Sequence, residues 1–128
     1  MANQLASVVY NVPVLFSNIE NNQQNFTRFI VLSKGDSKPE NPNKASVCFR
    51  LKHEVGSLAD VLSVLKKNGI SLSKIQSVPV FGEPKEYSFH ADLEWQDYGN
   101  FQKGIKKIMN STSTLSVLGE YVKATLEN

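Results

Sequence analysis

Hydrophobic and polar positions follow two different periods in the chain after residue 44. Apolar side chains recur at every second position over 47–51, 87–95 and 115–121, which is typical of strands with one buried face. Helical spacing appears between the first two of these segments and again after Asp97. The first helical stripe contains Leu58, Val61, Leu62 and Leu65, and the second contains Tyr98, Phe101, Ile105 and Ile108. The pattern therefore predicts three strands and two amphipathic helices.

A further strand is predicted over 70–79, although its alternation is imperfect. Ile70 and Leu72 alternate, but the phase slips at Lys74 and Ile75, which indicates a β-bulge in a strand at or near a sheet edge. The elements then follow the order β-α-β-β-α-β. Two right-handed crossovers fold this order into an α+β, ferredoxin-like sandwich, with a four-stranded antiparallel sheet and two helices on one face. The other face of the sheet is left uncovered.

The first part of the chain is less regular than the part after residue 44. Residues 1–33 contain only short apolar pieces, such as "VPVLF" and "FTRFIVL", separated by an amide-rich run. Residues 34–44, "KGDSKPENPNK", combine Gly and Pro with charges and contain no large apolar residue, so we expect a linker that buries nothing. The predicted organisation is a short segment, 1–33, a linker, 34–44, and one globular domain, 45–128.

Composition and charge exclude several classes of function. The formal net charge is +2, from 14 basic and 12 acidic residues, which is too small to indicate a polyanionic partner. Cys48, His53 and His90 lack the spacing of a zinc site, so we expect no metal and no cofactor, and we assign these side chains to packing or solvent. Neither a signal peptide nor a run of about 18 apolar residues is present, so a cytoplasmic protein without membrane contact is expected.

The start of the first helix is a candidate binding site. Gly56 precedes Ser57, and Asp60 three residues later resembles the second half of a capping box. Free backbone N–H groups and the helix dipole at such a start attract a carboxylate. From the spacing alone, however, an ordinary helix start is the better explanation of Gly56, Ser57 and Leu58.

An RNA-binding function is the weaker alternative suggested by the strand over 87–95. Lys85, Tyr87 and Phe89 occupy positions that match the base-stacking strand of an RNA-recognition motif. Glu86 stands where that motif has Gly, and Tyr87 and Phe89 share their phase with Trp95. This phase favours an aromatic core stripe, so we expect no nucleic-acid partner.

Residues 53–94, "HEVGSLADVLSVLKKNGISLSKIQSVPVFGEPKEYSFHADLE", resemble the regulatory ACT domain of prephenate dehydratases. That family has a Gly-Ala-Leu turn at the start of its first helix, and this chain has Gly56, Ser57 and Leu58. The family continues with Gly-hydrophobic-Asn-hydrophobic-Thr-Lys-hydrophobic-Glu-Ser-Arg-Pro, where this chain reads "GISLSKIQSVP" over 69–79. Ser71, Gln76 and Val78 thus replace the Asn, Glu and Arg of the family motif.

The first 33 residues also resemble a part of that family. Its catalytic domain closes with an Asn-rich stretch and a Thr-Arg-Phe strand just before the linker to the ACT domain. Here Thr27, Arg28 and Phe29 match the strand. The resemblance implies that 1–33 is the end of a catalytic domain and that these three residues are the remnant of a catalytic site, which alone should be inactive.

The resemblance also implies a function and a set of site residues. ACT domains of this family sense L-phenylalanine and form a homodimer through the sheet, so we expect allosteric feedback on phenylalanine biosynthesis, by this or a similar apolar amino acid. The implied ligand-binding residues are Gly56, Ser57, Leu58, Ala59, Ser71, Gln76, Ser77, Val78 and Pro79. A second hypothesis is that the chain pairs with a separate catalytic chain to form an active prephenate dehydratase.

Overall fold

A computed structural model describes residues 4–19, 21, 29–35 and 39–124 of the chain. The chain divides into two compact units, Met1–Lys34 and Gly35–Asn128, here called the N-terminal unit and the sheet unit. The described part of the N-terminal unit contains one short helix, α1 (Gln4–Val9), in which no residue is buried. The large apolar side chains described after it, including Leu15, Phe16 and Val31, are also exposed. This unit therefore has no apolar core among its described residues.

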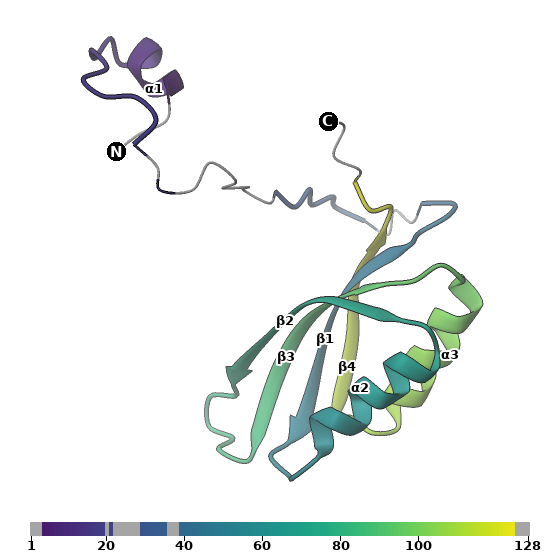
Figure 1. The fold of residues 1–128 in the computed structure, drawn as a ribbon. Coiled ribbons are helices and arrows are strands. Elements are labelled where there is room, and N and C mark those ends of the chain that lie inside the picture. The colour runs from purple at the N-terminus through teal and green to yellow at the C-terminus, as the bar shows by residue number, and fades with distance from the viewer. Residues whose placement is uncertain (1–3, 20, 22–28, 36–38, 125–128) are drawn as a thin grey trace. The chain divides into compact units, whose positions relative to one another are not determined.

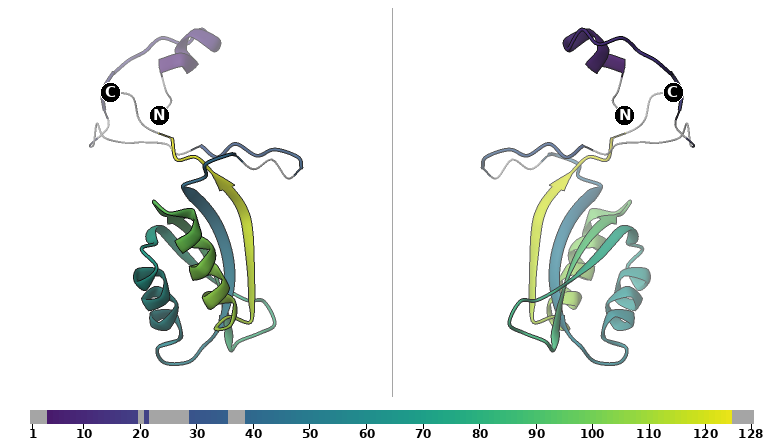
Figure 2. Two further views of the ribbon diagram at one scale, coloured as in Figure 1. Left: turned by 90° about the vertical axis from the view of Figure 1, so that its right-hand side faces the viewer. Right: turned by 90° about the vertical axis from the view of Figure 1, so that its left-hand side faces the viewer.

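The sheet unit contains the predicted order of elements. It consists of β1 (Lys44–Lys52), α2 (Ser57–Lys67), β2 (Ser71–Pro79), β3 (Glu86–Glu94), α3 (Tyr98–Met109) and β4 (Thr114–Tyr121). The strands form one antiparallel sheet in the order β2-β3-β1-β4 (Figure 1). Figure 2 shows both helices on the same face of this sheet. The α+β, ferredoxin-like prediction is confirmed.

The apolar phase of the strands explains why one sheet face is covered. Val47, Phe49 and Leu51 of β1 are buried and alternate with more exposed residues. Their partners on β3 are Ala91, Phe89 and Tyr87, which therefore lie on the same face. This face packs against α2 and α3 and forms the core with these buried residues: Ala45, Val47, Phe49, Leu51, Val61, Leu65, Ile70, Ala91, Leu93, Trp95, Phe101, Ile105 and Ile108.

Strand β2 lies at the sheet edge, as its irregular sequence predicted. Its register against β3 shifts between Leu72 and Lys74, where the alternation slips in phase. Nearly every residue of the strand is exposed. One long edge of β2 is therefore free of strand partners within the described part of the chain.

The second helix begins and packs through two identifiable residues. Asp97 caps α3, because its carboxylate accepts a hydrogen bond from the Asn100 amide at 2.7 Å. Gly104 is buried, and a Cβ atom there would collide with the side chain of Ile70. The glycine thus permits the close approach of α3 to the chain between α2 and β2, at some cost in helix propensity.

The prediction that 34–44 is a linker burying nothing needs correction at its C-terminal end. Pro42 is buried, and Lys44 is the first residue of β1. Asn43 is bonded through its backbone to Tyr121 and Trp95. The sequence pattern does not predict these contacts, because residues without large apolar side chains can still be held by backbone hydrogen bonds to strands that are remote in sequence.

Candidate functional site

Helix α2 begins at Ser57, and the N-cap before it is Gly56, whose backbone is left-handed (φ 88°). Such a φ is costly for residues with a Cβ atom, so glycine is favoured here. The Gly56 carbonyl accepts from the Asp60 amide at 2.9 Å, and the Ser57 amide donates to the Glu54 carbonyl at 3.3 Å. Among the residues that the structure describes, no acceptor contacts the amides of Gly56, Leu58 or Ala59.

The capping-box interpretation of Ser57 and Asp60 is wrong. Ser57 is the first helical residue rather than the N-cap, and its hydroxyl donates to the Lys52 carbonyl at 3.0 Å. Among the described residues, no side chain caps the N-terminus of α2. The hydroxyl therefore closes the loop between β1 and α2. The amides of Leu58 and Ala59, which have no acceptor among the described residues, are left available to an external acceptor.

A cavity of about 410 Å³ lies beside this helix start. Its volume is within the range of about 300–1,000 Å³ that is typical of small-molecule sites. Apolar side chains from three elements line much of it, and Lys52, His53 and Glu54 supply polar groups at the loop. The lining residues are Leu51, Lys52, His53, Glu54, Gly56, Ser57, Leu58, Ala59, Leu62, Tyr87 and Phe89, and we call this cavity the helix-start pocket.

The helix-start pocket contains four of the nine residues that the family motif indicated. Gly56, Ser57, Leu58 and Ala59 all line it. The other five lie on β2 and do not line it. Ser71 pairs with Glu94 at one end of the β2–β3 ladder, and Gln76, Ser77, Val78 and Pro79 pair with 87–90 of β3 at the other. Within one chain, the structure therefore does not bring the two halves of the motif into one pocket.

Sequence reasoning missed the aromatic floor of this pocket. Tyr87 and Phe89 come from β3, and the Phe89 ring stacks on Phe49 with centroids 5.4 Å apart. Both lie on the helix-covered face, so they cannot form the exposed stacking platform that an RNA-recognition motif requires. Cross-strand register supplies the signal that spacing alone lacks, because Leu51 pairs with Tyr87 and Phe49 with Phe89.

The three residues assigned to packing or solvent divide between the two faces of the sheet. His53 lines the pocket, and its ring lies 5.1 Å from that of Tyr87. Cys48 is half-buried on the open face, with Sγ 3.3 Å from Ser88 Oγ and 4.0 Å from His90 Nε2. No group of three or more potential metal ligands is found in the described ranges.

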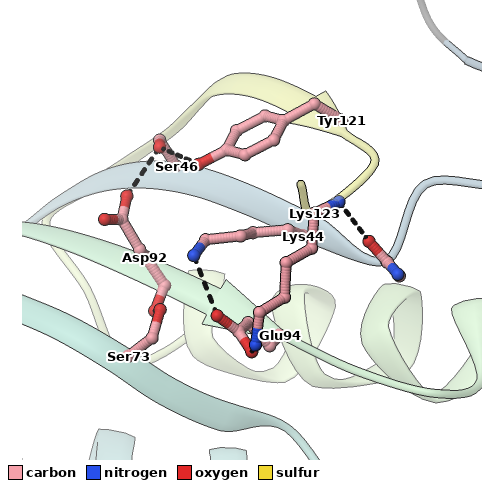
Figure 3. Close-up of polar contacts among 8 residues, drawn as sticks. Lys44, Ser46, Ser73, Asp92, Glu94, Tyr121 and Lys123 are labelled. Atoms are coloured by element: carbon pink, nitrogen blue, oxygen red, sulfur yellow. Dashed lines mark hydrogen bonds and ion pairs between the residues drawn. The ribbon is translucent and has the colours of Figure 1, made fainter. Parts of the chain in front are cut away.

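The open face carries a polar network near the end of the sheet that is remote from the helix-start pocket (Figure 3). Asp92 is buried and accepts from the Ser46 hydroxyl at 2.6 Å, and Ser46 also lies 2.9 Å from the Tyr121 hydroxyl. Glu94 binds Lys44 at 2.8 Å and Lys123 at 2.7 Å. Hydrogen bonds from Lys123 and then Lys44 lower the pKa of Glu94 from 4.5 to about 2.

The candidate catalytic residues are only partly visible. Thr27 and Arg28 lie outside the described residues, and Phe29 is exposed.

No helix in the described ranges is long and apolar enough to cross a membrane.

Comparison with known proteins relates both units to one enzyme family. The prephenate dehydratase family model matches residues 1–37. A bifunctional chorismate mutase/prephenate dehydratase from Aquifex aeolicus is 38% identical over 128 residues, which cover 99% of this chain and 35% of that protein. One from Buchnera aphidicola subsp. Schizaphis graminum is 33% identical over 94% of this chain and 32% of its own length. The chain corresponds to a prephenate dehydratase C-terminal region. It spans about a third of the length of these relatives.

Solved structures agree with this family and fold. A prephenate dehydratase from Streptococcus mutans matches with a TM-score of 0.56 and 26% identity, over 68% of this chain and 50% of that chain. One from Arthrobacter aurescens, in complex with L-Phe, gives a TM-score of 0.63 at 23% identity, over 72% of this chain and 31% of that chain. The second match supports the fold alone, because its identity is low. Both matches agree with the α+β fold described above.

Proposed function

We propose that the sheet unit is the regulatory amino-acid sensor of a prephenate dehydratase, and that L-phenylalanine or a similar apolar amino acid is its ligand. In this proposal, 1–33 is the end of the catalytic domain, 34–44 is the linker and 45–128 is the ACT domain. The single observation that carries the proposal is the helix-start pocket, where unbonded amides of α2 adjoin an apolar floor.

The pocket offers a complementary group for each part of such a ligand. The amides of Leu58 and Ala59 can receive the carboxylate, since the helix start is positive and these donors have no described partner. The carboxylate of Glu54, in the pocket lining, is a candidate acceptor for the ammonium. The apolar side chain then lies against Leu62 and Phe89.

The proposal includes a homodimer formed through the sheet. The outer edge of β2 has no strand partner among described residues, and an exposed edge favours pairing with another strand. Pairing with a second copy would extend the sheet. It would also give Gln76, Ser77, Val78 and Pro79 a role as the partner's wall of the site, which one chain alone does not provide.

Feedback would follow from differential binding. A ligand that binds one arrangement of the dimer more tightly shifts the population toward that arrangement, and attached catalytic domains experience the change. L-Phe is the first candidate to test, because the Arthrobacter aurescens enzyme, which shares this fold, was solved in complex with it. Catalytic activity, if the chain retains any, would need a separate catalytic chain.

Calorimetric titration with each of the twenty amino acids tests the sensor proposal. We expect heat from L-phenylalanine and weaker or no heat from charged amino acids, because the floor of the pocket is apolar. The absence of heat from all of them at millimolar concentration would leave a purely structural role for the domain.

The second candidate function, half of a split prephenate dehydratase, is favoured by one observation. The family match covers 1–37, where the described apolar side chains are exposed rather than packed. Mixing the chain with a catalytic domain that lacks this segment should then restore conversion of prephenate to phenylpyruvate. No conversion in the mixture would exclude it.

A further inference from the structure

The end of the linker is held by two segments that are remote in sequence, namely the residue after β3 and the C-terminal end of β4 with the residues after it. The Asn43 amide donates to the Tyr121 carbonyl at 3.2 Å, and the Asn43 carbonyl accepts from the Trp95 amide at 3.1 Å. The side-chain oxygen of Asn43 accepts from the Lys123 amide at 2.7 Å. Pro42, immediately before it, is buried. The chain therefore enters the domain at a fixed point between the ends of β3 and β4.

Glu94 reinforces the same point with two ion pairs (Figure 3). Its carboxylate binds Lys44, the residue after Asn43, at 2.8 Å and Lys123 at 2.7 Å. The Lys44 and Glu94 side chains are mostly buried, with exposed fractions of 12% and 21%, so solvent screens this pair less than a surface pair. We call Asn43, Lys44, Glu94, Trp95 and Lys123 the linker junction.

Strand β3 joins the linker junction to the helix-start pocket. Its first half supplies Tyr87 and Phe89 to the pocket, and its last residue is Glu94. Trp95 follows, and its ring stacks on Phe101 of α3 with centroids 3.7 Å apart. Because Trp95 directly follows β3, a displacement of β3 would act on the hydrogen bond between the Trp95 amide and the Asn43 carbonyl.

We propose that the linker junction is the output end of the sensor, where ligand-dependent movement of β3 changes how firmly the linker is held. The inference rests on the proposed function, because it needs a ligand in the helix-start pocket. It assigns Glu94 and Asn43 a positioning role, since neither lines the pocket. The coupling requires that the ligand favour one of two arrangements of the junction.

Amide NMR spectra of the full chain, recorded with and without saturating L-phenylalanine, test the inference. In the wild type, signals of Leu58 and Ala59 should shift, and those of Asn43 and Lys123 should shift with them. In Glu94→Gln, the response at Asn43 should fall by more than half, while ligand affinity stays within about threefold because Glu94 lies outside the pocket. Asn43→Ala provides a second variant without a charge change, and its readout is the ligand-induced shift of the Lys123 amide signal.

Glu83→Gln is the matched control, because Glu83 is an exposed carboxylate in the turn between β2 and β3. It should preserve the full response at Asn43. If the pocket signals shift in the wild type and those of Asn43 and Lys123 do not, the inference is overturned and the proposed function stands. If the pocket signals do not shift either, the proposed function fails, and the inference fails with it.

Discussion

The N-terminal unit and the sheet unit both contain many large apolar side chains, but they use them differently. The sheet unit buries its core residues between one sheet face and two helices. In the N-terminal unit, Leu15, Phe16, Val31 and Leu32 each expose more than four fifths of their surface. Hydrophobic stabilisation scales with the apolar area removed from water, so the sheet unit is stabilised by its own core. The N-terminal unit, which matches the prephenate dehydratase model, has no such core among its described residues.

The largest expected effect comes from truncating a core phenylalanine of the sheet unit, with an exposed phenylalanine of the N-terminal unit as the comparison. Phe101→Ala should lower the free energy of unfolding by about 3–5 kcal/mol, because it removes a buried ring that stacks on Trp95. The matched change Phe16→Ala should alter it by less than about 0.5 kcal/mol, since that ring is 82% exposed. Urea unfolding followed by circular dichroism measures both. Equal losses in the two variants would contradict the comparison.

The next effect concerns acid stability of the sheet unit. The pKa of Glu94 is lowered to about 2 in the folded state, so its ion pairs stabilise the fold above the unfolded pKa of 4.5 and this contribution is lost as the pH falls toward 2. Glu94→Gln should remove on the order of 2 kcal/mol at neutral pH and little below pH 2. The unfolding free energies of the wild type and of Glu94→Gln should converge as the pH falls toward 2. If the two curves stay parallel across this pH range, Glu94 does not have the lowered pKa.

A smaller loss is expected from the helix start of α2. Gly56→Ala should cost about 1–2 kcal/mol of stability, since alanine is strained at a φ of 88° although no atom obstructs its side chain. Gly119→Ala is the control, because a Cβ there also meets open space and its φ is not in the left-handed region. Thermal unfolding of both variants isolates the backbone strain, because neither added Cβ is crowded. A Gly56 variant as stable as the control would be evidence against strain.

The smallest effect is expected from removing the N-terminal unit. Deletion of Met1–Lys34 should change the unfolding free energy of the remaining chain by less than about 0.5 kcal/mol, because the core residues all belong to the sheet unit. Urea unfolding of the truncated and full chains provides the measurement. A large loss of stability on truncation would show that the two units fold as one.

The fold was predictable because its signals are local. The helical stripes of α2 and α3 and the phase slip at Lys74 in β2 can each be recognised within a short window of sequence. The linker junction could not be predicted in this way. Asn43, Glu94 and Lys123 meet only after three strands have paired, and nothing in the spacing of polar residues indicates those contacts.

The candidate site was half predictable for a similar reason. The family motif identified Gly56 to Ala59, which are consecutive and line the pocket together. Alternation places Tyr87 and Phe89 on a core stripe, because it gives the phase of a strand but not the cavity that the strand faces. Strand register is needed to bring them opposite Leu51 and Phe49, beside the start of α2.

The central claim is that free amides at the start of α2 bind the carboxylate of an apolar amino acid. Its most direct test compares calorimetric titrations of L-phenylalanine and L-phenylalaninamide, which keeps the ring and the amino group but lacks the carboxylate. The account predicts that L-phenylalanine binds at least about tenfold more tightly, the equivalent of one charge-assisted hydrogen bond. Equal affinity for the two compounds would contradict it.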